Sequence, residues 1–245
     1  MSLRSKHRRQ DRLDRLHLVA LEHISREGVQ GLRLGAIAKE LNYTTAALYR
    51  YYPSREALIQ ELQKQTLSLL DESLAILLTE AESLSPLAKL LLCVQFYSLY
   101  AERSPASFIL NSSLFASPRQ ILDREMRQET MTLIGGLLSI LSTLIEEAGL
   151  SKSNPPLRLA VGYWSTLYGS LMTLKYQADL PLPEPMELIS TLCIGWGANP
   201  VQVENAREES ATWHSWLYSQ EMDKLTALDH LNITSVDPSP PMEIS

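Results

Sequence analysis

The sequence predicts an all-α protein with an N-terminal three-helix domain and a larger C-terminal helical domain. Apolar residues recur at helical spacing along most of the 245 residues. Charge also divides the chain: residues 1–65 hold twelve Lys and Arg against seven Asp and Glu, a net +5, and the remainder, with ten against 21, is −11. We expect domains at residues 1–55 and 56–231 and a disordered tail at residues 232–245.

The first helix is predicted over about residues 9–27. Leu16, Ala20 and Ile24 lie on one helical face and should form its inner stripe. Gly28 follows as the left-handed residue that commonly ends a helix. Residues 1–8 are basic and are equally compatible with a solvated tail and with an arm that reaches DNA phosphates.

The stretch Leu34–Leu58 predicts two short helices, a tight turn and the start of a third helix. The turn falls at Asn42, a residue type that tolerates left-handed backbone. The second helix should run over about Thr44–Tyr51, because Pro53 disfavours helical geometry just before it. Ser54 then caps the next helix. Two helices joined in this way form a helix-turn-helix, whose second helix enters a DNA major groove.

The surface of the second helix supports this interpretation. Its first turn carries small or hydroxyl-bearing side chains, which let a backbone approach base edges. We expect Thr44, Thr45 and Arg50 at bases, and Tyr49, Tyr51 and Arg55 at phosphates. The alternative is a helical hairpin inside a larger core, with Arg50 a solvated charge. The full candidate set for DNA binding is Arg33, Thr44, Thr45, Ala46, Tyr49, Arg50, Tyr51 and Arg55.

One family shares this pattern. The matching residues are Gly28, Gly31, Leu32, Ile37, Ala38, Leu41, Leu48–Tyr52 and Ser54–Leu58. Over roughly residues 10–60 the chain therefore resembles the DNA-binding domain of the tetracycline-repressor (TetR) family of bacterial transcription regulators. It departs from the family where Arg33-Leu34 replaces threonines and Asn42 replaces the turn glycine.

The rest of the chain predicts a series of helices. The expected ranges are 54–80, 86–102, 105–114, 117–148, 157–179, 184–196 and 203–231, with Gly149 ending the fourth. The helix at 86–102 is nearly uncharged, so we expect it to be buried almost all round. Seven aromatic residues are candidates to line a ligand cavity, although for any single one of them core packing is the favoured role. They are Phe96, Tyr97, Tyr100, Phe108, Phe115, Trp164 and Tyr168.

The resemblance implies partners as well as a fold. Residues 157–196 would pair with their copies in a dimeric four-helix bundle, although they could instead close a monomeric core. The dimer would bind a palindromic DNA operator, usually as a repressor, and a small apolar effector would release it. Two other classes stay open: an all-α small-molecule-binding protein with a degenerate DNA-binding head, and a helical interaction protein.

Several classes are disfavoured by what the sequence lacks. The N-terminus has no apolar run and no stretch of 18 apolar residues occurs, so we expect a cytoplasmic protein without a membrane span. Cys93 and Cys193 stand alone, as buried thiols would. No catalytic motif or metal-ligand spacing is present, so we expect no enzyme, no metal and no cofactor. His17 and His23 are isolated in sequence and should be surface or packing residues.

Overall fold

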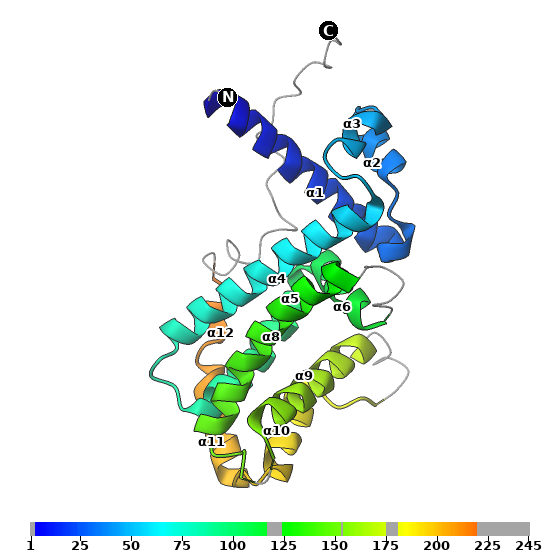
Figure 1. Ribbon diagram of the computed structural model, residues 1–245. Helices are drawn as coiled ribbons and strands as arrows, with labels where there is room; N and C mark the ends of the chain where they lie inside the picture. Colours follow the sequence, from blue (N-terminus) through cyan, green and yellow to red (C-terminus); the bar gives the residue numbers. More distant parts are fainter. Residues whose placement is uncertain (1–2, 117–123, 153, 175–180, 220–245) are drawn as a thin grey trace. The chain divides into compact units, whose positions relative to one another are not determined.

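The computed structural model describes residues 3–116, 124–152, 154–174 and 181–219. All regular elements in these residues are helices, which confirms the all-α prediction (Figure 1). The chain forms two compact units. The first contains residues up to Thr66 together with Ser104–Thr130, and the second contains Leu67–Arg103 and Met131–Thr226. The predicted domain boundary at residue 55 stays a prediction.

The first unit is built around α1. Its helices are α1 (Leu3–Gly31), α2 (Leu34–Glu40), α3 (Thr45–Tyr49), the first half of α4 (Arg55–Glu80) and α6 (Pro105–Ala116). Leu16, Ile24 and Leu48 are at most 1% exposed and form part of a common core. Gly28 interrupts α1 with a φ of 71°, as predicted, but the helix begins six residues before the expected start.

Local signals set the start of α4. The Ser54 hydroxyl accepts a hydrogen bond from the Ala57 N–H at 3.0 Å, which confirms the predicted cap. Further along the same helix, the Thr66 hydroxyl donates to the Asn111 side chain of α6 at 2.9 Å. Both of these side chains are buried, so the contact joins α4 to α6 inside the first unit.

The second unit is centred on α5 (Pro86–Arg103), which is buried almost all round, as its lack of charge predicted. Tyr163 lies in the core, and its hydroxyl donates to the Leu90 carbonyl of α5. Free thiols at Cys93 and Cys193 are also buried, as expected. The other helices are α8 (Arg124–Glu147), α9 (Pro156–Thr173), α10 (Pro185–Gly195), α11 (Pro200–Ala211) and α12 (His214–Leu217).

The end of the described chain differs from its prediction. A single helix over residues 203–231 was expected, and this is wrong within the described part. Instead α11 ends at Ala211 and a separate short helix, α12, packs on α5. The helix stops for one local and one tertiary reason. Thr212 is the C-cap of α11, and Leu217 of α12 is buried in the core with only 1% of its surface exposed.

Helix α8 passes through Gly135 and Gly136 without a break. Its segment Gln128–Glu147 is long and apolar enough to cross a membrane by length and composition alone, although no such segment was expected from the sequence. Core helices of soluble proteins pass the same criterion. Residues 117–123, the tail at 232–245 and the side chain of Phe115 lie outside the described residues.

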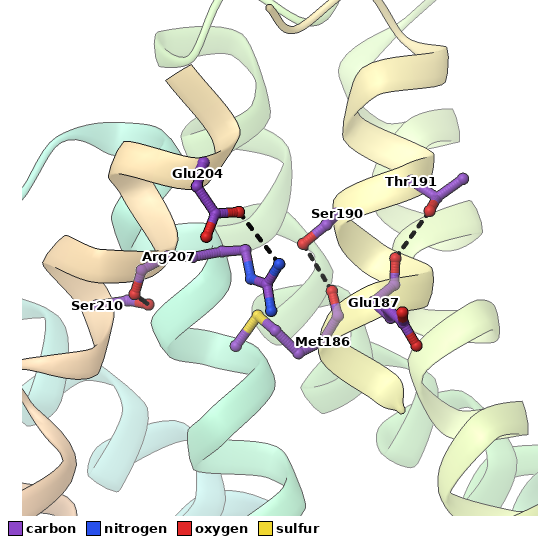
Figure 2. A network of polar contacts seen from close by, with 7 residues as sticks. All are labelled: Met186, Glu187, Ser190, Thr191, Glu204, Arg207 and Ser210. Carbon is purple, nitrogen blue, oxygen red and sulfur yellow. Dashed lines mark hydrogen bonds and ion pairs between the residues drawn. The ribbon is translucent and has the colours of Figure 1, made fainter. Parts of the chain in front are cut away.

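Polar side chains on α10 and α11 find partners close by (Figure 2). Ser190 and Thr191 donate their hydroxyls to backbone carbonyls of α10 itself, at 2.7 and 2.9 Å. On α11 the Arg207 guanidinium pairs with Glu204 at 3.2 Å, and Figure 2 shows it reaching toward Met186 of α10. Because these two α10 hydroxyls already donate hydrogen bonds within the helix, they do not need a water molecule to accept their hydrogens.

Candidate nucleic-acid interface

The turn between α2 and α3 has the geometry that the sequence predicts. Asn42 has a φ of +57°, and among the residues that the structure describes no other non-glycine residue has a positive φ. The Tyr43 N–H donates to the Ala38 carbonyl at 2.8 Å, which closes the end of α2. The chain therefore reverses within a few residues, and α3 packs directly against α2.

Helix α3 is short, and both its cap and its buried face hold it in place. Thr44 has extended backbone, and its hydroxyl accepts a hydrogen bond from the Ala47 N–H at 3.1 Å. Ala47 and Leu48 are buried in the first unit. The opposite face is open: Thr45 and Ala46 are exposed, and Tyr49 is 51% exposed. A rigid helix with a free face is what groove insertion requires.

A buried hydrogen bond fixes the chain just after α3. The Tyr52 hydroxyl and the His17 Nε2 atom are hydrogen-bonded, so they join α1 to the segment between α3 and α4. Burial lowers the pKa of His17 below its usual 6.5, against the charges of Glu61 and Asp14 that raise it. Burial also raises the pKa of Tyr52 to about 12. Both side chains are therefore neutral near pH 7.

A second histidine ties α1 to α2. The His23 Nε2 atom lies 2.9 Å from the Glu40 carboxylate, which also lies 3.5 Å from the Arg26 guanidinium. His23 is buried, whereas Glu40 and Arg26 are exposed. The sequence analysis treated both histidines as isolated and so missed these hydrogen bonds. The position of His17 could have indicated its burial, because it falls within the apolar stripe of α1 next to Leu16.

The candidate cations occupy different environments. Arg33 is exposed at the start of α2 and makes no capping bond there, and Arg50 is exposed at the end of α3. Arg55 is half-buried: its Nη1 donates to the Gln30 carbonyl at 3.2 Å and its Nε to the Glu56 carboxylate at 3.2 Å. Arg55 thus ties the start of α4 to the end of α1.

The predicted ligand-lining aromatics are not all together. Phe108 lies in the first unit, and the remaining described ones lie in the second. Trp164 and Tyr168 stack on α9 with ring centres 5.2 Å apart, and Tyr97 and Tyr100 are neighbours on α5 at 5.8 Å. Burial raises the pKa of Tyr97, and a hydrogen bond with Trp164 opposes that rise. Helices α5 and α9 therefore share one aromatic cluster: Tyr97, Tyr100, Trp164 and Tyr168. Phe96 is buried on α5.

A groove of about 220 Å³ lies elsewhere in the second unit, between α5, α12 and the start of α10. Its polar lining includes Gln95, Glu102 and His214, and none of the predicted aromatic residues lines it. Among the described residues no group of three or more His, Cys, Asp or Glu side chains is placed to hold a metal ion.

Comparison with known proteins adds to this geometry. The family model for bacterial regulatory proteins of the tetR family matches residues 18–62. One similar solved structure is PfmR, a TetR family transcriptional regulator from Thermus thermophilus, with 18% identity, a TM-score of 0.56, and coverage of 74% of this chain and 96% of PfmR. Another is the reduced form of E. coli NemR, with 18% identity, a TM-score of 0.56, and coverage of 76% of this chain and 98% of NemR. Curated proteins gave no match. At this identity the solved structures establish the fold.

Proposed function

This chain is a TetR-family DNA-binding transcription regulator, and from that premise we propose that it is a dimeric cytoplasmic repressor released by a small apolar effector. The observation that carries the proposal is the capped, firmly held α3 with its exposed outer face. Regulators of this family are transcription factors and not enzymes, which agrees with the sequence prediction. The alternative of a degenerate DNA-binding head loses its main support, because the α2–α3 geometry is intact.

In the proposed complex each α3 enters a major groove. Thr45 and Arg50 contact bases, and Thr44 joins them through its hydroxyl hydrogen, because its oxygen already accepts the capping bond. Tyr49 supplies a phosphate contact from the same helix. Arg33, Ala46, Tyr51 and Arg55 complete the interface, with Arg55 using the N–H groups that Gln30 and Glu56 leave available.

Self-association through residues 157–196 is supported by an apolar stripe on α9. Leu157 and Val161 are 55% and 45% exposed, and Met172 continues the same face. Trp164 and Tyr168 lie between them at helical spacing and are half-buried. Such a stripe would be costly to leave in water, and a second copy of the chain would bury it. The satisfied hydroxyls of α10 suit the same interface.

The effector part of the proposal rests on the aromatic cluster of α5 and α9. Its chemistry favours an apolar or aromatic compound, because the rings supply apolar surface and few charges. Binding there would favour one arrangement of the two DNA-binding heads over the other, and so shift the population away from the DNA-competent form. The two α3 helices of a dimer need a separation of about 34–36 Å to reach successive major grooves.

The DNA-binding proposal is tested by selecting fragments of source-genome DNA with the purified full chain and sequencing what is retained. We expect enrichment of a palindrome. Arg50→Ala should lose that enrichment, whereas Lys152→Ala, an exposed charge change in the second unit, should keep it. If the folded wild-type dimer enriches no sequence, or if Arg50→Ala selects the same palindrome equally well, the proposed reading helix is wrong.

The dimer is tested by light scattering coupled to size-exclusion chromatography. The wild type should elute at about twice the 27.6 kDa chain mass. Val161→Glu places a charge in the proposed interface and should give monomers. Val201→Glu is the matched control, because Val201 is 67% exposed on α11 outside that interface, and it should stay dimeric. A dimeric Val161→Glu protein would refute the assigned interface.

The effector is tested by intrinsic fluorescence and by release of bound operator. A panel of aromatic compounds is titrated into the wild type and into Trp164→Phe, in which Trp196, Trp213 and Trp216 remain as the reference signal. An effector should quench the wild type, lose most of that signal in Trp164→Phe, and release the operator. A compound that releases the operator with equal fluorescence change in both proteins would place its site away from the cluster.

A further inference from the structure

Helix α1 extends well beyond the packed part of the first unit. It begins at Leu3, but the first fully buried side chain along it is Leu16, at 1% exposure, and the match to the tetR family model begins only at residue 18. Among the described side chains before Leu13, those of His7, Arg9, Gln10 and Asp11 are exposed. Residues 3–15, roughly 20 Å of helix at 1.5 Å per residue, therefore precede the first buried side chain that the structure describes. We name residues 3–15 the N-terminal extension.

The extension is strongly basic in a chain that is acidic overall. It carries six Lys and Arg residues against Asp11 and Asp14, a net +4, whereas the whole chain is −6. Gln10 donates to Asp14 at 2.8 Å, so one of the two carboxylates is already hydrogen-bonded. Arg9 and Arg15 are exposed.

The positive charge of the extension destabilises the start of α1. The first turn of α1 contains no acidic residue, so cations lie at the N-terminal end, where the helix dipole is positive. A short segment without packing is marginal as a helix in water. A polyanion beside the extension would remove both costs. An anionic membrane fits less well, because a membrane-binding helix needs an apolar face, and within the extension Leu3 is the single large apolar residue before Leu13.

The direction of the extension points to DNA as the polyanion. Within the first unit, the N-terminal end of α1 and helix α3 both lie at the top of the view in Figure 1, set apart from each other. We propose, resting on the proposed function, that the N-terminal extension is a second DNA-contacting element, which lies along phosphates beside the groove that α3 enters. Phosphate contacts add affinity without reading sequence, so the extension strengthens binding to any duplex equally.

The test measures DNA affinity against salt concentration for the full chain. Two labelled duplexes are used, a generic duplex of about 30 bp, long enough for two successive major-groove sites, and the selected operator. In Arg9→Gln/Arg15→Gln the slope of log affinity against log salt should fall by about 3.6, because the bound dimer loses four phosphate contacts at about 0.9 each. Both duplexes should be weakened by the same factor, so the preference for the operator is unchanged. The control is Lys64→Gln/Lys152→Gln, which makes the same charge change at exposed positions outside the extension.

The outcomes separate this proposal from the proposed function. If the two double variants have equal slopes on the generic duplex, the extension does not contact DNA and the proposal is overturned, even where Arg50→Ala still abolishes operator preference. If no operator is found but the generic slope falls only in Arg9→Gln/Arg15→Gln, the extension binds DNA and the assigned repressor function fails. Loss of binding to phosphatidylserine vesicles without change on DNA would assign the extension to membranes and overturn the proposal.

Discussion

Replacing Tyr52 by phenylalanine tests how the reading helix is held. Tyr52 and His17 are 8% and 3% exposed, and their hydrogen bond spans from α1 to the segment that follows α3. The substitution keeps the ring and removes one oxygen. It leaves the His17 Nε2 atom buried without its partner, and a buried polar group left in this way costs about 1–3 kcal/mol. Tyr52→Phe should therefore lower the free energy of unfolding by that amount.

The expected shift in melting temperature follows from the chain length. For a protein of 150–250 residues, 1 kcal/mol corresponds to about 2–4 °C, so Tm should fall by about 2–12 °C. Calorimetry and urea denaturation at about pH 7.5, where His17 is neutral in the folded and unfolded chain, would measure the change. Tyr49→Phe is the matched control: it removes the same oxygen from a side chain that is 51% exposed, and it should change stability by less than about 0.5 kcal/mol.

A double variant isolates the hydrogen bond from other effects of the substitution. His17→Leu combined with Tyr52→Phe removes both polar partners, and the two costs should not add, with a coupling of about 1 kcal/mol or more. The reasoning would be refuted by a Tyr52→Phe protein as stable as Tyr49→Phe, or by additive single costs. Either result would mean that the two side chains do not depend on each other.

Three further predictions concern stability. Thr44→Ala should lower the free energy of unfolding by about 1 kcal/mol in urea melts through loss of the α3 cap, while Thr45→Ala, at an exposed position, should be close to neutral. Burial lowers the pKa of His17, so the stability that the neutral side chain contributes is fully present above the unfolded pKa of 6.5 and is lost as pH falls toward the folded pKa. The difference in the free energy of unfolding between wild type and His17→Gln should therefore shrink between about pH 7.5 and about pH 5. Tyr163→Phe should cost about 1 kcal/mol in the same melts, because its buried hydroxyl donates to Leu90, and an unchanged stability would contradict that bond.

The helix-turn-helix could be predicted because its signals are local. A left-handed residue at Asn42, a glycine stop at Gly28 and a hydroxyl cap at Ser54 each act within four residues of chain, and the structure confirms all three. Proline at the first turn of α9 and α10 is a signal of the same kind. Such features depend on φ, ψ and neighbouring N–H groups, which the sequence specifies directly.

The contacts of the candidate site needed the fold. His17 meets Tyr52 across 35 residues, and Arg55 meets the Gln30 carbonyl across 25, so no spacing rule relates them. The seven aromatic candidates were chosen by type alone, and type does not say that Phe108 belongs to a different unit from Tyr97. Burial and pairing at such distances follow from packing against other helices.

The sequence by itself therefore determined an all-α chain, its helix-turn-helix and a basic head on an acidic body. Tertiary structure alone decided which side chains are hydrogen-bonded within the fold and which are exposed. Arg50 is exposed, whereas Arg55 donates a hydrogen bond to the Gln30 carbonyl of α1, although both are arginines in one short stretch. The reason is that exposure and hydrogen-bond partners belong to the packed surface, whereas caps, turns and helical periodicity belong to the chain.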